Sequence, residues 1–207
     1  MRKANTMEKE PQVLILSGFL GSGKTTVLMR LITYLRETRG EAYRIAIIEN
    51  EIGSASVDSS IIREAGYSVT EMLAGCICCT LIGQLVPSIQ RLCEELSPDL
   101  IILEATGVAT PETMRDSITK YAGLPVRVVT IVDASRWEKI RIALEMLLKN
   151  QVEPADVICV NKTDLVDEAA IAEVERTVRE MNETAPIVRM NAAKPPDPAD
   201  LAKLASA

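Results

Sequence analysis

The sequence predicts an α/β fold of three layers, in which helices cover both faces of a mostly parallel central sheet. Short apolar runs alternate with amphipathic segments along nearly the whole chain, and no internal repeat is visible. The apolar runs are continuous, as in Leu100 to Leu103, which is typical of a parallel strand buried on both faces. The 207 residues suffice for one such domain with a sizeable core.

The elements follow from the spacing of apolar residues. The predicted strands are Val13 to Leu16, Arg44 to Ile48, Tyr67 to Met72, Leu100 to Leu103, Val126 to Val132, Val157 to Val160 and Ile187 to Met190. The predicted helices are Thr26 to Glu37, Leu81 to Leu96, Pro111 to Lys120, Trp137 to Leu148 and Asp167 to Met181.

Local signals support these limits. Apolar residues recur at helical spacing in the first helix, at Leu28, Leu31, Ile32 and Leu35. Gly40 ends this helix, and Pro111 stands at a favourable first-turn position of a later one. The polar stretch from Glu49 to Ser60 contains glycine and serine, so it is predicted to be a loop.

The two ends of the chain differ from this alternation. Residues 1–12 are predicted to form a polar tail, residues 13–191 the domain, and residues 192–207 a proline-rich tail or a short terminal helix. The N-terminal tail lacks the apolar middle of a signal peptide, and no apolar run is long enough to span a bilayer. A cytoplasmic protein with no membrane partner is expected, and the net charge of -6 disfavours a nucleic-acid partner.

A phosphate-binding loop is predicted at Gly18 to Thr25, which fits G-x-x-x-x-G-K-[ST] between a strand and a helix. Its glycines allow backbone N–H groups to point at phosphate. We expect Lys24 to contact the β- and γ-phosphates and the Thr25 hydroxyl to bind Mg²⁺. The nucleotide-binding residues expected here are Gly18, Gly21, Ser22, Gly23, Lys24, Thr25 and Thr26. The alternative is a glycine-rich turn that matches by chance.

A guanine-binding loop is predicted at Asn161, Lys162, Thr163 and Asp164, directly after a strand. The carboxylate of Asp164 accepts hydrogen bonds from the ring N–H and the amino group of guanine, whereas adenine offers the opposite pattern. The alternative is an ordinary polar turn, which is common after a strand. The tetrapeptide indicates guanine binding only because a P-loop precedes it in the chain.

Glu104 and Gly107, in the sequence E-A-T-G after a strand, complete the expected phosphate site. Glu104 is expected to hold Mg²⁺, and the N–H group of Gly107 to contact the γ-phosphate. Without the P-loop, Glu104 would be read as an acid in a turn or a cap. Together the three motifs predict a P-loop GTPase domain over residues 13–191, which binds GTP or GDP with Mg²⁺.

These motifs resemble the CobW branch of the P-loop GTPases, which serve metalloprotein maturation. The resemblance runs from about Val13 to Met190 and is carried by the segments Gly18 to Thr26, Asn50 to Gly53 with Asp58 after it, Gly75 to Cys79, Glu104 to Gly107 and Asn161 to Asp164. It implies a metallochaperone or metal-insertion factor for zinc, cobalt or nickel proteins or for corrinoid metabolism. A client metalloprotein or corrinoid-related protein is the expected partner, and a homodimer is one expected arrangement.

A thiol cluster, Cys76, Cys78 and Cys79, lies within four residues in a chain that has no histidine. Thiolates select metals such as Zn²⁺, Cu⁺ or Co²⁺, and the resemblance implies a transition metal here, Zn²⁺ or Co²⁺. A fourth ligand has to be a carboxylate, water or a partner's group, and Glu49 and Glu51 are candidates by family position. The alternative is a set of small buried residues, which is favoured for Cys93 and Cys159.

The expected catalytic residues are Lys24, Glu104 and Asp58, the last in a switch-like loop where it assists Mg²⁺ or orients water. The nucleotide state is expected to move segments 49–58 and 106–111 and so to alter the thiol ligands. The sequence places no arginine as a finger in cis, so slow GTP turnover is expected, accelerated by dimerisation or a partner. Two alternatives remain, a metal-buffering or sensing protein with little hydrolysis and, less favoured, a P-loop kinase.

Overall fold

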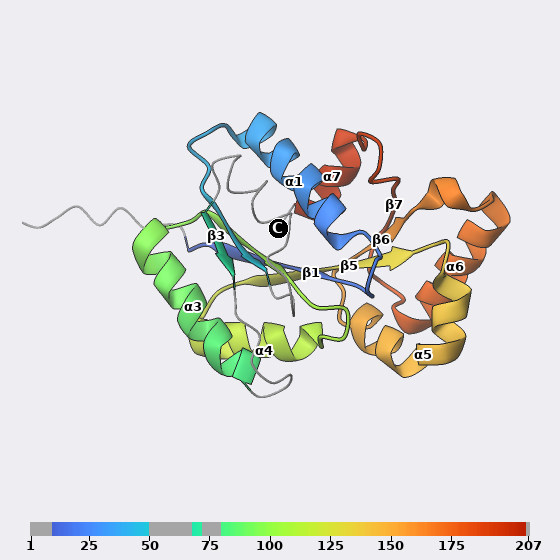
Figure 1. The fold of residues 1–207 in the computed structure, drawn as a ribbon, viewed down its shortest axis with the longest axis horizontal. Coiled ribbons are helices and arrows are strands. Elements are labelled where there is room, and N and C mark those ends of the chain that lie inside the picture. The colour runs from blue at the N-terminus through green and yellow to red at the C-terminus, as the bar shows by residue number, and fades with distance from the viewer. Residues whose placement is uncertain (1–9, 50–67, 72–79, 206–207) are drawn as a thin grey trace, which may run out of the picture.

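The computed structural model describes residues 10–49, 68–71 and 80–205, which form a sheet between two layers of helices (Figure 1). The strands are β1 (Gln12–Ser17), β2 (Ile45–Glu49), β3 (Ser68–Glu71), β4 (Leu100–Glu104), β5 (Val126–Asp133), β6 (Val157–Asn161) and β7 (Ile187–Arg189). Their order in the sheet is β3-β2-β4-β1-β5-β6-β7, and all pairings among these strands are parallel. The predicted three-layer fold is confirmed.

The helices are α1 (Lys24–Arg39), α3 (Thr80–Leu96), α4 (Pro111–Ala122), α5 (Trp137–Val152), α6 (Glu168–Met181) and α7 (Pro198–Ala205), with a short 3-10 turn, η1 (Thr163–Leu165). Helices α1 and α7 lie on one face of the sheet, and α3, α4, α5 and α6 cover the other (Figure 1). In the part of the chain that the structure describes, none of them has both the length and the apolar character needed to cross a bilayer.

Each central strand contributes side chains to two hydrophobic cores, one on each face of the sheet. In β1, Val13 and Ile15 pack into the core under α3 to α6, whereas Leu14 and Leu16 pack into the core under α1 and α7. Successive side chains of a strand point to opposite faces, so a strand covered on both faces is apolar over most of its length. Burial of one such side chain contributes about 1.5–3 kcal/mol.

The helix ends follow local chemistry. Helix α1 begins at Lys24 rather than at Thr26, because the last two residues of the P-loop form its first turn. The carboxylate of Asp167 caps α6 by accepting a hydrogen bond of 2.8 Å from the N–H group of Ala170. Helix α5 extends beyond its predicted end, and Leu144 breaks its regular geometry with φ -140° and ψ 39°.

The C-terminal segment contains a packed helix. Leu201 and Leu204 of α7 are buried in the core that α7 shares with α1.

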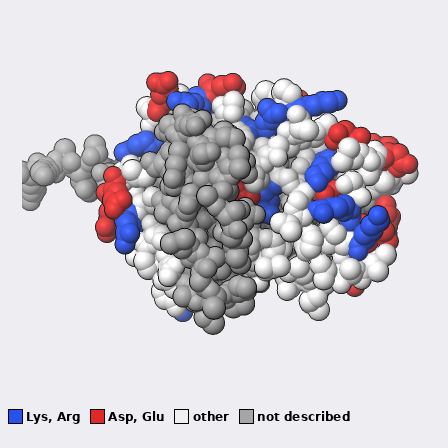
Figure 2. Space-filling model, in the orientation of Figure 1, with Lys and Arg blue, Asp and Glu red and all other residues white. Residues whose placement is uncertain are grey.

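On the face seen in Figure 2, basic and acidic side chains are interspersed. Exposed ion pairs, such as that of Arg189 with Glu175, contribute little to stability because water screens them.

Candidate functional site

The motifs predicted from the sequence meet at one edge of the sheet, where the central strands end. The P-loop follows β1, the E-A-T-G segment follows β4, and the N-K-T-D segment follows β6. Strand β1 lies between β4 and β5, and the chain that leaves it returns as β2 on the far side of β4. Ligands of open α/β sheets bind at such a point, outside the carboxyl ends of the strands.

The P-loop is tightly folded. Its glycines, Gly18, Gly21 and Gly23, all have positive φ angles. The ammonium group of Lys24 donates a hydrogen bond of 3.2 Å to the carbonyl oxygen of Gly18, and the Lys24 side chain is buried. The N–H group of Ser22 donates to the carbonyl oxygen of Phe19 at 3.0 Å. The positive charge of Lys24 therefore lies against the loop that is predicted to bind phosphate.

The two predicted magnesium ligands are in contact. The Oγ1 atom of Thr25, at the start of α1, donates a hydrogen bond of 2.9 Å to Oε1 of Glu104, at the end of β4. Both are hard oxygen donors of the kind that Mg²⁺ prefers, so the residues present fit this ion. Glu49 lies directly beside Glu104 in the pairing of β2 with β4.

Gly107 packs on the P-loop. A Cβ atom at this position would lie 2.7 Å from the backbone nitrogen of Leu20, so only glycine allows the two segments to approach so closely. The carbonyl oxygen of Gly107 accepts a hydrogen bond of 2.7 Å from Nε2 of Gln151, which is buried near the end of α5. Sequence reasoning missed Gln151, because it ended this helix at Leu148.

The N-K-T-D segment is attached to the P-loop. Asn161 is buried, and its Nδ2 atom donates to the carbonyl oxygen of Ser22 at 2.9 Å. Its Oδ1 atom accepts from the N–H group of Ala192, beyond β7, at 3.0 Å. Asn161 therefore joins three loops at this edge. Asp164 lies on η1 and is exposed.

A buried carboxylate that the sequence analysis did not single out lies behind this segment. Asp133, at the end of β5, is 3% exposed and pairs with Lys162 at 2.7 Å and with Arg136 at 3.0 Å. Ser135 also donates to it. Burial raises the pKa of the Asp133 carboxyl, but the hydrogen bonds from Lys162, Ser135 and Arg136 outweigh it and hold the pKa below its usual value. Its place at the end of the strand next to β1 was the signal that could have revealed it.

Other predicted site residues lie apart or outside the described ranges. Thr26 is exposed on α1. Asp58, Glu51 and the thiol cluster of Cys76, Cys78 and Cys79 fall outside the residues that the structure describes. Over the described ranges alone, no group of three or more Cys, Asp or Glu side chains is placed to hold a metal ion. The roles of all these residues stay predictions.

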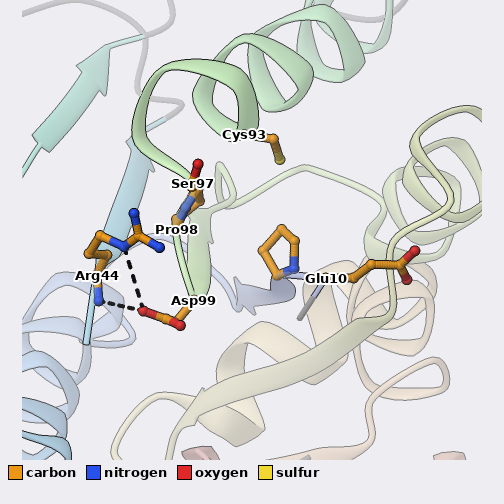
Figure 3. Close-up of a pocket in the computed structure, with 7 residues that line it drawn as sticks. Glu10, Arg44, Cys93, Ser97, Pro98 and Asp99 are labelled. Carbon is orange, nitrogen blue, oxygen red and sulfur yellow. Dashed lines mark hydrogen bonds and ion pairs between the residues drawn. The ribbon is translucent and has the colours of Figure 1, made fainter. Parts of the chain in front are cut away.

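A pocket of about 300 Å³ lies at the opposite edge of the sheet, where strands begin (Figure 3). It is lined by Glu10, Pro11, Arg44, Cys93, Ser97, Pro98 and Asp99. The backbone N–H group of Arg44 donates to the carboxylate of Asp99 at 2.8 Å, and the two residues form one wall. None of the predicted nucleotide-binding residues lines this pocket, so we do not assign it to the nucleotide.

The parallel sheet, the glycine-rich loop after β1 and the motif loops beside it define a P-loop nucleotide-binding domain. Comparison with known families agrees with this class. The family model described as CobW/HypB/UreG, nucleotide-binding domain, matches residues 12–189. The chain therefore belongs to the CobW/HypB/UreG family.

Three relatives illustrate the similarity. The Zinc-regulated GTPase metalloprotein activator 1 of Dictyostelium discoideum is 30% identical over an alignment of 229 positions, which includes 90% of this chain and 47% of that protein. The Zinc chaperone YjiA of Escherichia coli (strain K12) is 32% identical over 185 residues, which cover 84% of this chain and 56% of that protein. The crystal structure of the hydrogenase maturation factor HypB from Archaeoglobus fulgidus superposes with a TM-score of 0.66 at 21% identity, covering 91% of this chain and 85% of that one.

The likeness to HypB confirms the fold alone, because the identity is low. The chain spans about half the length of the two curated relatives. Similarity to them therefore supports the family and the nucleotide-binding domain, and the activity of the longer proteins enters only as a proposal.

Proposed function

We propose that this protein binds GTP with Mg²⁺, hydrolyses it slowly and couples the nucleotide state to the binding of a transition metal that it passes to a client protein. The observation that carries the proposal is the hydrogen bond between Thr25 and Glu104, which brings a P-loop hydroxyl and a strand-end carboxylate to one point. Such a pair holds the magnesium ion of P-loop nucleotide hydrolases.

Different residues of the chain are proposed to have different roles in phosphoryl transfer. The Lys24 ammonium, which already lies against the P-loop, would contact the β- and γ-phosphates. The N–H groups of the loop and the positive end of α1 would stabilise the phosphate charge. Thr25 and Glu104 would hold Mg²⁺, whose positive charge would offset the negative charge that develops on the phosphates. Asp58 is proposed to orient water or to assist the ion.

Guanine recognition is assigned to the N-K-T-D segment. Asn161 fixes the segment against the P-loop, so the phosphate site and the base site have a set separation. The exposed carboxylate of Asp164 is proposed to accept the two hydrogen bonds that guanine donates. Adenine cannot donate both, which argues against an ATP-dependent kinase.

The metal is proposed to bind as cargo at Cys76, Cys78 and Cys79, with Glu49 as a further ligand. Thiolates favour zinc over magnesium or calcium, and the named functions of the activator from Dictyostelium and of YjiA both concern zinc. Glu49 lies at the end of β2, directly beside Glu104. The proposed ligand of the transition metal, Glu49, is therefore the direct neighbour in the sheet of the proposed magnesium ligand, Glu104.

Hydrolysis over many turnovers tests the proposal. Purified protein with Mg²⁺ is expected to release phosphate from GTP, slowly, and an excess of ATP is expected not to compete. Lys24→Ala is expected to remove turnover and to weaken triphosphate binding, because it removes a point charge at the phosphates. Turnover at the wild-type rate in Lys24→Ala, or a preference for ATP, would contradict the proposal.

A further inference from the structure

We propose that Arg136 is a positioning residue of the phosphate site, which holds the tip of the P-loop in the conformation that receives phosphate. This inference rests on the proposed function, since it concerns how the same loop binds GTP. Arg136 directly precedes α5 and belongs to none of the three motifs. Arg136 contacts the P-loop from the segment between β5 and α5, whereas the guanine-binding loop contacts it from the segment after β6.

The guanidinium group of Arg136 packs against the peptide that joins Leu20 to Gly21. Its Nη2 atom donates a hydrogen bond to the carbonyl oxygen of Leu20, and its Nε atom donates to Asp133 at 3.0 Å. A Cβ atom on Gly21 would lie 2.8 Å from the same Nη2 atom, and Gly21 has a φ angle of 75°. A larger residue at position 21 would therefore displace Arg136 as well as strain the backbone.

This contact fixes the direction of a phosphate-binding N–H group. In a trans peptide the carbonyl of Leu20 and the N–H group of Gly21 lie in one plane and point in opposite directions. Because Arg136 holds the carbonyl group of Leu20, it also sets the direction of the N–H group of Gly21, one of the P-loop amides that would bind phosphate. Asn161 holds the carbonyl of Ser22 in the same way, and thereby orients the N–H group of Gly23.

One buried carboxylate aligns the donors. Asp133 binds both Arg136 and Lys162, and Lys162 donates to the next carbonyl of the loop, that of Gly21, at 2.6 Å. Arg136 uses two separate N–H groups to reach Asp133 and Leu20 at once. A lysine presents a single compact ammonium group on a flexible stem, so it does not reproduce this fork.

The test measures the affinity for a fluorescent, non-hydrolysable GTP analogue with Mg²⁺ in the wild type, Arg136→Ala and Arg136→Lys. We expect both variants to bind about tenfold or more weakly and to turn over GTP about 100-fold more slowly, because misplacing a reacting group by about 1 Å has an effect of that size. Added guanidinium ion is expected to restore part of the affinity of Arg136→Ala, which a general folding defect would not show. Arg141→Ala removes the same charge from an exposed pair with Glu138 on α5, and it is expected to bind as the wild type does.

Wild-type affinity in both Arg136 variants would overturn the positioning role, as would full affinity in Arg136→Lys or no recovery with guanidinium. Melting curves accompany each measurement, and if Arg136→Ala does not fold, Arg136→Lys carries the test. A wild-type protein that binds no guanine nucleotide would overturn the proposed function together with this inference. The two failures are therefore distinguishable by the behaviour of the wild type alone.

Discussion

The hydroxyl group of Thr25 donates a hydrogen bond of 2.9 Å to the carboxylate of Glu104, although 79 positions separate the two residues in the sequence. The pairing of β1 with β4 makes this contact, because it places Leu16 opposite Glu104 at the point where the P-loop begins. The first turn of α1 then brings Thr25 over the end of β4. The contact joins the P-loop to the segment that contains Gly107.

Removal of this contact is expected to weaken Mg²⁺ binding. Thr25→Ala and Glu104→Gln should each lower the affinity for Mg²⁺ in the presence of GDP at least about tenfold, since even indirect ligands of a metal have effects of 10- to 100-fold. Thr25→Ser keeps the hydroxyl group and is the matched control. Titration of Mg²⁺ by calorimetry measures the effect, and unchanged affinity in Glu104→Gln would remove Glu104 from the ion site.

Base specificity is expected to depend on Asp164. Asp164→Asn should lower the affinity for GTP by about tenfold or more, which corresponds to about 1.4 kcal/mol, and should raise the affinity for xanthosine triphosphate, whose altered edge suits an amide. Asp167→Asn changes the same functional group nearby, at the cap of α6, and serves as the control. Calorimetric titration with both nucleotides distinguishes the two variants. Tight GTP binding by Asp164→Asn would show that another residue reads the base.

The contribution of Asp133 to stability is expected to depend on pH. Asp133→Asn keeps the shape but removes the charge that Lys162 and Arg136 bind, so it should lower the free energy of unfolding by about 1.5–3 kcal/mol at pH 7. The pKa of Asp133 is lower in the folded protein than its ordinary value of 3.8. The stabilisation is therefore fully present above about pH 4 and is lost as the pH falls through the folded-state pKa.

Urea unfolding of the wild type and of Asp133→Asn, at a series of pH values, measures this difference. The two proteins should converge in stability as the pH falls below about 4. A difference that stays constant, or that grows towards low pH, would mean that Asp133 is not held as a carboxylate by its cationic neighbours.

Gln151 is expected to favour the triphosphate over the diphosphate. Its Nε2 atom holds the carbonyl oxygen of Gly107, the residue whose N–H group is proposed to contact the γ-phosphate. Gln151→Leu should therefore weaken binding of a non-hydrolysable GTP analogue about tenfold, the effect of losing a hydrogen bond and leaving its acceptor poorly paired, and should weaken GDP binding less. Gln90→Leu, on the exposed side of α3, is the control. Equal losses for both nucleotides would assign Gln151 a purely structural role.

The sequence predicted the sheet well because the central strands are buried on both faces. In β1 and β4 every buried position except Ser17, the last residue of β1, is apolar, so continuous apolar runs mark these strands. The P-loop, E-A-T-G and N-K-T-D segments were also predictable, because each combines an unusual residue pattern with a place directly after a strand. Whether the residues in them perform their proposed roles stays a prediction.

The parts of the site that the sequence did not predict depend on tertiary contacts. Asp133, Arg136 and Gln151 belong to no motif, and each binds a carbonyl group or a cation from a distant segment. Apolar periodicity also failed at Leu144, where α5 departs from helical geometry although its sequence remains helical in pattern. Interactions between side chains and backbone groups of other loops leave no periodic signal in a sequence.

Binding of the transition metal and binding of the nucleotide are proposed to be coupled, and the absorption of bound Co²⁺ reports this coupling. Thiolate ligation by Cys76, Cys78 and Cys79 is expected to give an intense charge-transfer band, and its strength at a fixed Co²⁺ concentration is expected to differ between GDP and a non-hydrolysable GTP analogue. Cys93→Ser should keep both the band and the difference. Burial raises the pKa of Cys159 to about 12, so this residue stays a thiol and is not expected to contribute.

The band and its dependence on nucleotide are both expected to disappear when Cys76, Cys78 and Cys79 are replaced by serine. A coupling of about 1–3 kcal/mol is typical of linked sites, and Co²⁺ should change the affinity for the nucleotide by the same factor. Two results would contradict the proposed coupling through the thiol cluster. One is a wild-type protein whose Co²⁺ affinity is the same with GDP and with the GTP analogue, and the other is a triple variant that binds Co²⁺ as the wild type does.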